Sequence, residues 1–441
     1  MKWLSLLVLS AWSIASLNAQ EQRAGAASHP PEVYAKDVEF LLKELPEKAG
    51  HFFKQKQIDW KAVEKEFRKE AASVSTDEEH MKLCSRLLAR LKDGHAGLRD
   101  SKVSLPDESQ GRRWTGPRVH LLVSGGKVYV RTAFGPALEA GIKPGQEVAA
   151  IDGTPARRWL DEKAAKMRDE GGYSTDQQAL YAACHWGLAD WEGTSIEFTT
   201  RDPGKSASKK TVIIRRGGPN FAPLGPAVFP PGLKTAGRQS YGKTAGGFAY
   251  IHLRDIPANL PEQLDAMLAD IGEAPGLILD LRANGGGGCD HEAVLGRFLP
   301  PGQRWANAVG QGAKPFTGPM VVIYDAGVRS AGETIGGMFQ EDGGRAYTIG
   351  DTPTAGMSSQ KTTLPLPSGL FSAYFSVHSN KARFNGGRGI EGIGMIPAEI
   401  VPYDPNELFK GIDTQIRRAE ELLAKGFPRG VVTYVPPKKS R

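Results

Sequence analysis

The sequence predicts a multidomain α/β protein, and three patterns support this prediction. Residues 32–100 place apolar side chains every three or four positions, which is typical of amphipathic helices. Residues 117–216 contain short runs that alternate apolar with polar side chains, which is typical of strands. From residue 247 onward, apolar runs such as LILDL alternate with helical segments, which indicates an α/β layer. We therefore expect an N-terminal helical bundle, a β domain and an α/β domain, in that order.

The composition is that of a globular protein with a substantial core. The chain has 441 residues, of which 40% are hydrophobic and 24% are charged, so two or three domains are expected. The formal net charge is +7, but the basic residues are spread along the chain. Because no long Lys/Arg block alternates with aromatic residues, we do not expect a nucleic-acid partner. The charge instead favours a mild preference for acidic partners.

The N-terminal stretch MKWLSLLVLSAWSIASLNAQ has the layout of a secretory signal peptide. An early lysine precedes an apolar segment, and small residues follow near residue 19. The apolar segment is short for a membrane span, and no later stretch has the ~18 apolar residues that a span needs. We therefore expect a signal peptide at residues 1–20, a secreted or periplasmic protein, and no stable membrane insertion after cleavage.

The three cysteines, Cys84, Cys184 and Cys289, permit at most one disulfide. They form no C-x-x-C pair of the kind that binds zinc, and no His/Asp/Glu cluster has the spacing of metal ligands. We expect neither a metal nor a cofactor.

Two turn-rich stretches divide the chain. SLPDESQGRRWTGP follows the helical part, and RGGPNFAPLGPAVFPPGLKTAGR follows the strand-rich part. The expected units are a helical domain at 21–113, a β domain at 114–217, an α/β core at 218–405, and a C-terminal helix with a basic tail at 406–441.

The stretch GPALEAGIKPGQEVAAIDG resembles a PDZ domain. Gln146 stands where that family usually has aspartate, and a long helical insert separates this stretch from the last strands. The resemblance implies that an extended peptide binds at a loop, whose members here are Gly135, Ala140, Gly141 and Ile142. Whether the insert leaves the peptide groove open is not decided by the sequence.

Three later segments resemble the C-terminal processing peptidases and the tricorn protease core. They are GLILDLRANGGGG, VVIYDAGVRSAGETIGGMFQEDGGRAYTIGDTPTAG and GRGIEGIGMIPAEIVP, in the family's order and after a PDZ-like domain. The resemblance implies a ββα-repeat core of the ClpP/crotonase type. It also implies a serine peptidase that cleaves proteins or peptides through an acyl-enzyme.

Ser330 has two interpretations. SAGE fits a capping box, in which serine and glutamate satisfy free N–H groups at the start of a helix. The resemblance places the nucleophile at the same serine, where the N–H of Ala331 can face an oxyanion. The glycine loop supplies the second oxyanion donor, which the family places at Gly285 or Gly286.

The base differs from that of the best-known family members. Their Ser–Lys dyad takes its lysine from F-G-K-G-S-V-Q, whereas TPTAGMSSQ has Gly356 at that position, and Lys361 lies five residues further on. The tricorn-type branch uses a Ser-His-Glu arrangement instead, and His95 and Glu391 occupy its positions. We therefore expect the tricorn-type branch. An exposed loop histidine and a surface carboxylate remain the alternative interpretations.

Two further alternatives stay open. Cys289 lies two residues before His291, but catalytic Cys–His partners rarely lie so close in sequence. Loss of the family lysine also fits a non-catalytic protein on this fold that binds a peptide or a lipophilic ligand, as the retinoid-binding protein of the photoreceptor matrix does. The sequence reveals no substrate, and it permits a homo-oligomer without indicating its size.

Overall fold

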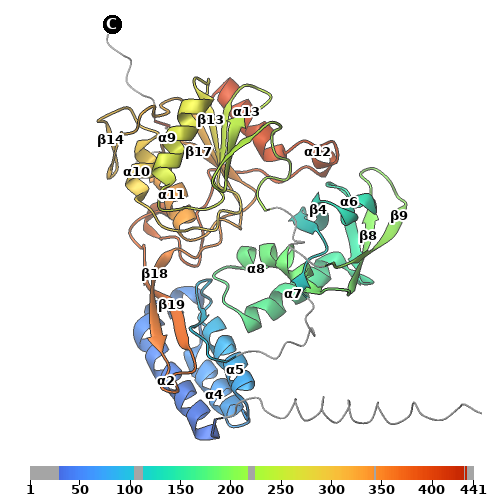
Figure 1. Ribbon diagram of the computed structural model, residues 1–441, viewed down its shortest axis with the longest axis vertical. Helices are drawn as coiled ribbons and strands as arrows, with labels where there is room; N and C mark the ends of the chain where they lie inside the picture. The colour runs from blue at the N-terminus through green and yellow to red at the C-terminus, as the bar shows by residue number, and fades with distance from the viewer. Residues whose placement is uncertain (1–28, 104–112, 217–223, 342–343, 432, 435–441) are drawn as a thin grey trace, which may run out of the picture.

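The computed structural model describes residues 29–441 apart from 104–112, 217–223, 342–343, 432 and 435–441. The expected signal peptide therefore lies outside the described residues. Figure 1 shows helices at one end, a six-stranded sheet beside them and a seven-stranded sheet at the other end. The architecture is mixed α/β, which confirms the predicted class. Within the described part of the chain, no helix is long and apolar enough to cross a membrane.

The N-terminal helices begin where the sequence provides capping side chains. Asp59 accepts a hydrogen bond from the N–H of Ala62, and Thr76 accepts one from Glu79, so two helices start at these residues. Their apolar faces form a core that includes Leu41. The helices are α2 (Pro31–Ala49), α3 (Phe53–Lys56), α4 (Trp60–Ala71) and α5 (Asp77–Ala89), with a 3₁₀ turn at Gly50–Phe52.

A hairpin from the C-terminal half completes this helical core. Strands β18 (Ser359–Pro365) and β19 (Ser372–Ser379) form this hairpin, β19 lies beside α2 (Figure 1), and Phe371 and Phe375 pack among the helices. Strand β1 (Gly97–Arg99) pairs with β19, so the sheet order is β1-β19-β18. Residues that the sequence places in the 218–405 unit thus join the two ends of the chain.

The six-stranded sheet has the order β3-β4-β5-β8-β9, with β6 paired to β5. The expected helical insert forms α7 and α8, which bury Leu160 and Ala179 against Ile196 and Phe198 of the sheet. The elements are β3 (Val119–Ser124), β4 (Lys127–Ala133), α6 (Pro136–Glu139), β5 (Glu147–Ile151), β6 (Thr154–Pro155), α7 (Ala156–Glu170), α8 (Asp176–Ala183), β8 (Ser195–Arg201) and β9 (Ser208–Ile214). Short strands β2 (Trp114–Thr115) and β7 (Asp190–Trp191) pair nearby, and a 3₁₀ turn spans Trp186–Leu188.

The seven-stranded sheet has the order β10-β11-β12-β13-β16-β17-β20, and it is parallel from β12 onward. Helices α9, α10 and α11 cover one face and α13 covers the other (Figure 1), which buries β13 and β16 completely. The elements are β10 (Lys234–Ala236), β11 (Gln239–Lys243), β12 (Ala249–His252), α9 (Leu260–Ile271), β13 (Leu277–Asp280), α10 (His291–Gly296), β14 (Arg304–Trp305), β15 (Ala308–Val309), β16 (Met320–Tyr324), α11 (Ala331–Met338), β17 (Tyr347–Gly350), β20 (Glu399–Ile400), α12 (Pro405–Phe409) and α13 (Thr414–Lys425).

The parallel pairing of β13 with β16 brings two loops together. Both strands end at the same edge of the sheet, so the glycine loop after β13 meets the segment that leads to Ser330. The six-stranded sheet docks nearby through Arg131 of β4, whose buried guanidinium donates to Asp325 Oδ2 at 2.9 Å and to the Gly225 carbonyl at 2.5 Å.

Candidate active site

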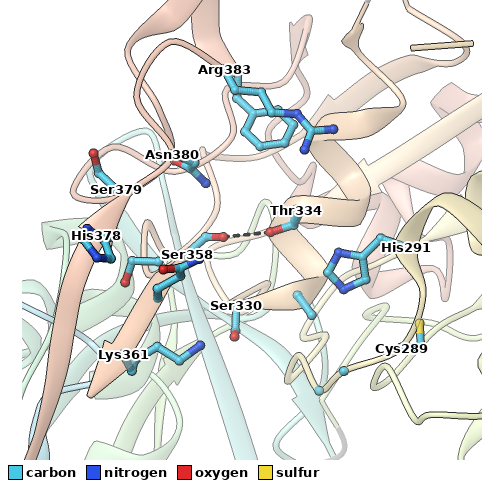
Figure 2. Close-up of a pocket in the computed structure, with 16 residues that line it drawn as sticks. Cys289, His291, Ser330, Thr334, Ser358, Lys361, His378, Ser379, Asn380 and Arg383 are labelled. Carbon is cyan, nitrogen blue, oxygen red and sulfur yellow. Dashed lines mark hydrogen bonds between the residues drawn. The ribbon is translucent and has the colours of Figure 1, made fainter. Parts of the chain in front are cut away.

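Ser330 stands at the start of α11 in an unusual backbone conformation, with φ of 56° and ψ of −126°. Such a conformation costs a non-glycine residue about 1–3 kcal/mol, so its surroundings must hold it. The Ser330 N–H donates to the Met357 carbonyl at 3.1 Å and to Glu333 Oε2 at 3.1 Å. The side chain faces a cavity (Figure 2), which is how a nucleophile between a strand and a helix is displayed.

Glu333 does more than cap the helix. Its carboxylate is fully buried and accepts hydrogen bonds from Thr354 Oγ1 at 2.5 Å, from the N–H of Gly356 at 2.7 Å and from the N–H of Met357 at 2.9 Å. Burial raises the pKa of Glu333 to about 8, and these donors oppose that rise. Glu333 thus ties residues 354–357 to the start of α11.

Gly356, which the sequence places where Ser–Lys peptidases have their lysine, leaves no room for a side chain in this conformation. Its φ is +78°, and a Cβ there would lie 2.6 Å from Thr175 Cγ2 and 3.0 Å from the Gly394 nitrogen. A Ser–Lys dyad with its lysine at this position is sterically excluded.

His95 is not an exposed loop residue. Its side chain is only 9% exposed, and both ring nitrogens are buried without a hydrogen-bond partner among the described residues. Asp93 shapes the loop, since Oδ1 accepts from the N–H of His95 at 2.9 Å and Oδ2 accepts from the N–H of Ser376 at 2.7 Å. Met357 links this loop to Ser330. Its sulfur packs against Gly94, where an added Cβ would lie 2.7 Å away, and its carbonyl accepts from the Ser330 N–H.

Glu391 is buried beside His95. Its Oε1 accepts from Lys56 Nζ at 2.7 Å and from Ser174 Oγ at 2.9 Å, and its Oε2 has no partner in the described part of the chain. One ligand-type atom each from His95, Glu391 and Asp93 lies within 4.8 Å of the other two. These three side chains could therefore ligate a metal by distance, but the Lys56 ammonium already supplies a positive charge to Glu391. The structure brings His95 and Glu391 together from opposite ends of the chain.

Burial shifts the pKa of both groups toward their neutral forms. It lowers the pKa of His95 to about 4, against the opposing effect of Asp93, so the imidazole is neutral and can accept a proton. Burial raises the pKa of Glu391 to about 7, and the Lys56 charge opposes this rise. Lys361 and Arg329 also lower the pKa of His95, which places their charges near the imidazole.

Lys56 and Ser174 are contacts that the sequence did not predict. The Lys56 side chain is 3% exposed, lies over the Phe52 ring at 4.8 Å and also donates to the Lys92 carbonyl at 2.9 Å. Lys92 Nζ donates back to the Lys56 carbonyl at 2.8 Å. No local signal marks a lysine whose partner lies 335 positions away.

The two glycine amides expected at the oxyanion site are engaged elsewhere. The N–H of Gly285 donates to the Arg254 carbonyl at 3.0 Å, and the N–H of Gly286 donates to Asn284 Oδ1 at 2.9 Å. The physical reason is that the loop packs against the residues just after β12, and that the Asn284 side chain accepts a hydrogen bond from within the same loop.

Gly287 offers a replacement amide. Ile256 bonds to both neighbours of Gly287, so the N–H of Gly287 points away from Ile256. Gly287 and Ala331 both line the cavity, and no hydrogen bond of the described residues uses either N–H. The loop is close to the nucleophile, because a Cβ on Gly286 would lie 2.7 Å from Ser330 Cβ.

The cavity at Ser330 has a volume of about 760 Å³. Thr334 Oγ1 and Ser358 Oγ hydrogen-bond at 2.8 Å on its wall (Figure 2). Cys289 and His291 lie on the opposite side, where burial raises the pKa of Cys289 to about 11. A thiol that stays protonated near neutral pH is a poor rival to Ser330.

The residues expected to bind a peptide terminus lie on the six-stranded sheet, away from this cavity. The N–H groups of Ala140, Gly141 and Ile142 donate to backbone carbonyls of residues 136–138. A Cβ on Gly135 would lie 2.6 Å from Arg118 Nη1. In this conformation these amides are not free to receive a carboxylate.

Comparison with known proteins gives consistent matches. Residues 247–401 match peptidase family S41. A carboxyl-terminal-processing protease of Picosynechococcus is 27% identical over 372 residues, which cover 79% of this chain and 78% of that protein. One from Synechocystis is 28% identical over 312 residues, which cover 67% of this chain and 64% of that protein.

Among solved structures, mature CPAF complexed with lactacystin shares the fold with a TM-score of 0.66 and 11% identity, over 90% of this chain and 98% of that one. The region that carries Ser330, the glycine loop and Glu391 is therefore similar to peptidase family S41, and the chain as a whole is similar to carboxyl-terminal-processing proteases.

Proposed function

We propose that the protein is a serine endopeptidase in which Ser330 attacks the substrate carbonyl and His95 accepts its proton. The observation that carries this proposal is the buried imidazole of His95 beside Glu391, in a loop packed on the residue that holds Ser330; neither ring nitrogen has a hydrogen-bond partner among the described residues. A neutral histidine without such a partner is available as a general base.

The proposed reaction begins at Ser330. Ser330 Oγ bonds to the carbonyl carbon as His95 takes its proton, and ionised Glu391 stabilises the imidazolium. The N–H groups of Gly287 and Ala331 stabilise the oxyanion. His95 then gives the proton to the leaving amine, and water releases the acyl group by the same route.

Lys56 and Ser174 are positioning residues in this proposal. Both donate to Glu391 Oε1, which leaves Oε2 as the oxygen for the imidazole. The Lys56 charge also favours the ionised carboxylate that the mechanism needs.

The finer assignments follow from the same proposal. We assign the chain to the tricorn-type branch, since Gly356 excludes a lysine and His95 and Glu391 are adjacent. The proposed domain limits are those expected from the sequence, and the protein is exported by its N-terminal signal. Residues 114–217 form a PDZ-like domain in this proposal, whose amides at 140–142 must be released before it binds an extended peptide. The non-catalytic alternative is not favoured.

Hydrolysis of an unfolded protein substrate tests the proposal. Ser330→Ala and His95→Ala should each lower kcat/KM by at least about 10³-fold while the fold is retained. Ser206→Ala is the matched control, because Ser206 is exposed and does not line the Ser330 cavity. Wild-type rates in Ser330→Ala would refute the proposal.

A further inference from the structure

The wall of the Ser330 cavity carries positive charge without negative charge. Its ionic side chains are Lys361 and Arg383, its titratable imidazoles are His291 and His378, and no carboxylate lines it in the part of the chain that the structure describes. Arg383 is already compensated, because it contacts Glu341 at 2.5 and 2.8 Å. Lys361 therefore provides the available charge.

Lys361 reaches toward Ser330. Figure 2 shows its side chain extending from β18 toward the serine hydroxyl. No hydrogen bond or ion pair to its ammonium occurs among the described residues. A register shift between Gln360 and Lys361 interrupts the alternation of β18, so three successive residues, 359–361, line the cavity. Irregularities of this kind re-aim side chains beside active sites.

Neighbouring groups also favour a ligand that accepts hydrogen bonds. Asn380 Oδ1 accepts from the N–H of Ile390 at 2.8 Å, which leaves the amide NH₂ for a ligand. Strand β18 is the last strand of its sheet, so its outer edge can pair with an extended peptide that passes Ser330.

We propose that the peptidase selects acidic polypeptides, and that Lys361 binds a substrate carboxylate close to the scissile bond. This inference rests on the proposed function. An unpaired ammonium in a partly enclosed cavity donates a charge-assisted hydrogen bond to a carboxylate, whereas a neutral amide accepts a weaker one and a cation is repelled. The carboxylate belongs either to an Asp or Glu side chain or to a free C-terminus.

Matched peptides distinguish these sources. One pair differs only by Glu against Gln near the cleaved bond, and a second, neutral pair differs by a free against an amidated C-terminus. Wild-type kcat/KM should be about tenfold higher for the carboxylate member of one pair, and the ratio should fall with salt. Lys361→Met should bring that ratio to about one while the neutral peptide is still cleaved. The Lys361→Glu variant should show a higher kcat/KM for a peptide with Lys near the cleaved bond than for the matched peptide with Glu there.

Two controls keep the test decisive. Lys410→Met removes the same charge from an exposed position on another element and should leave the ratio unchanged. Binding of both pairs to Ser330→Ala, followed by fluorescence anisotropy, tests the carboxylate site without turnover and should show about tenfold tighter binding of the carboxylate member.

Each contrary result has its own meaning. Equal binding within both pairs, or a ratio that survives Lys361→Met, overturns the inference. Loss of all cleavage in Lys361→Met, including that of neutral peptides, also overturns it and identifies Lys361 as the base. Selective binding by Ser330→Ala together with no cleavage by the wild type supports the carboxylate site and refutes the proposed function.

Discussion

At the residue scale, Gly356 bears on which base can serve Ser330 in the proposed mechanism. The left-handed φ and the close contacts with Thr175 and Gly394 disfavour any side chain here, so we do not expect a lysine to act from this position. The N–H of Gly356 also donates to Glu333, which holds the Ser330 backbone. Gly356 thus helps to hold the Ser330 backbone through Glu333, while it provides no side chain that could act as a base.

Gly356→Ala should lower the free energy of unfolding by more than the cost of placing an alanine in a left-handed backbone conformation. The left-handed conformation alone costs about 1 kcal/mol, and the clashes should raise the total to about 3 kcal/mol. Gly204→Ala is the control, since Gly204 has φ of +71° but nothing near its Cβ position. Urea denaturation of both variants measures the difference. Equal costs would show that the packing around Gly356 is looser than described.

The pH dependence of hydrolysis should follow the His95–Glu391 pair. Burial lowers the pKa of His95 to about 4, so the imidazole is neutral at higher pH. Burial raises the pKa of Glu391 to about 7, and only its ionised form stabilises the imidazolium. We expect kcat/KM to rise with pH and to show an apparent pKa near 7 that belongs to the pair. A rate that is constant between about pH 5 and pH 8 would contradict this assignment.

At the scale of elements, α3 brings the N-terminal helices to the active site. The short helix ends at Lys56, whose ammonium contacts Glu391, while Asp93 places negative charge near the same carboxylate. Because burial and Asp93 both disfavour ionisation of Glu391, the lysine is the group that offsets them.

Lys56→Met should shift the pH–rate profile to higher pH. Removing the cation raises the pKa of Glu391, so at neutral pH kcat/KM should fall by about tenfold and recover at higher pH. Lys56→Arg keeps the charge and should restore part of the rate. Lys92→Met, which loses the bonds of Lys92 Nζ to the Lys56 and Gln57 carbonyls but leaves the Lys56 ammonium in place, should keep the wild-type profile. A uniform loss at every pH would indicate that Lys56 is merely structural.

The elements that sequence could predict are those defined by local patterns. Strand β13, strand β16 and the start of α11 at Ser330 all follow from short apolar runs and a capping box. The hairpin of β18 and β19 reads as strands too, but nothing local shows that Phe371 and Phe375 pack among helices more than 280 positions earlier. Packing between segments so far apart in the chain produces no periodic pattern in the sequence that could predict it.

At the scale of the whole molecule, two sheets are joined by a buried charge. Arg131 of the six-stranded sheet is 2% exposed and pairs with Asp325, which follows β16. Nearby acidic and tyrosine groups favour the charged guanidinium and offset its desolvation. Asp325 lies in the loop that leads from β16 to Ser330. The same loop therefore contacts the six-stranded sheet and positions Ser330.

Arg131→Met should destabilise the protein by about 3–5 kcal/mol, because it leaves Asp325 buried without its partner. Arg68→Met removes an exposed ion pair with Glu39 and should cost less than about 1 kcal/mol. Chemical denaturation measures both free energies of unfolding. Similar small costs would show that the sheet is held by other contacts.

The site shows the same limit of prediction as the fold. Motifs mark Ser330, His95 and Glu391, and the structure places His95 beside Glu391, while their catalytic roles stay a prediction. Lys56 and Ser174 were missed because their partner, Glu391, lies far away in sequence. The oxyanion donors were placed at Gly285 and Gly286 since a run of glycines looks uniform in sequence. Only the bonds to Arg254 and Asn284 distinguish those amides from that of Gly287.

Labelling with a fluorophosphonate probe, followed by peptide mapping, tests the central claim most directly. The probe reports an activated serine without requiring knowledge of the substrate. We predict that the wild type is labelled at Ser330, that His95→Ala is not labelled, and that Lys361→Met is still labelled. Labelling of Ser330 in His95→Ala at the wild-type rate would contradict the assignment of His95 as the base.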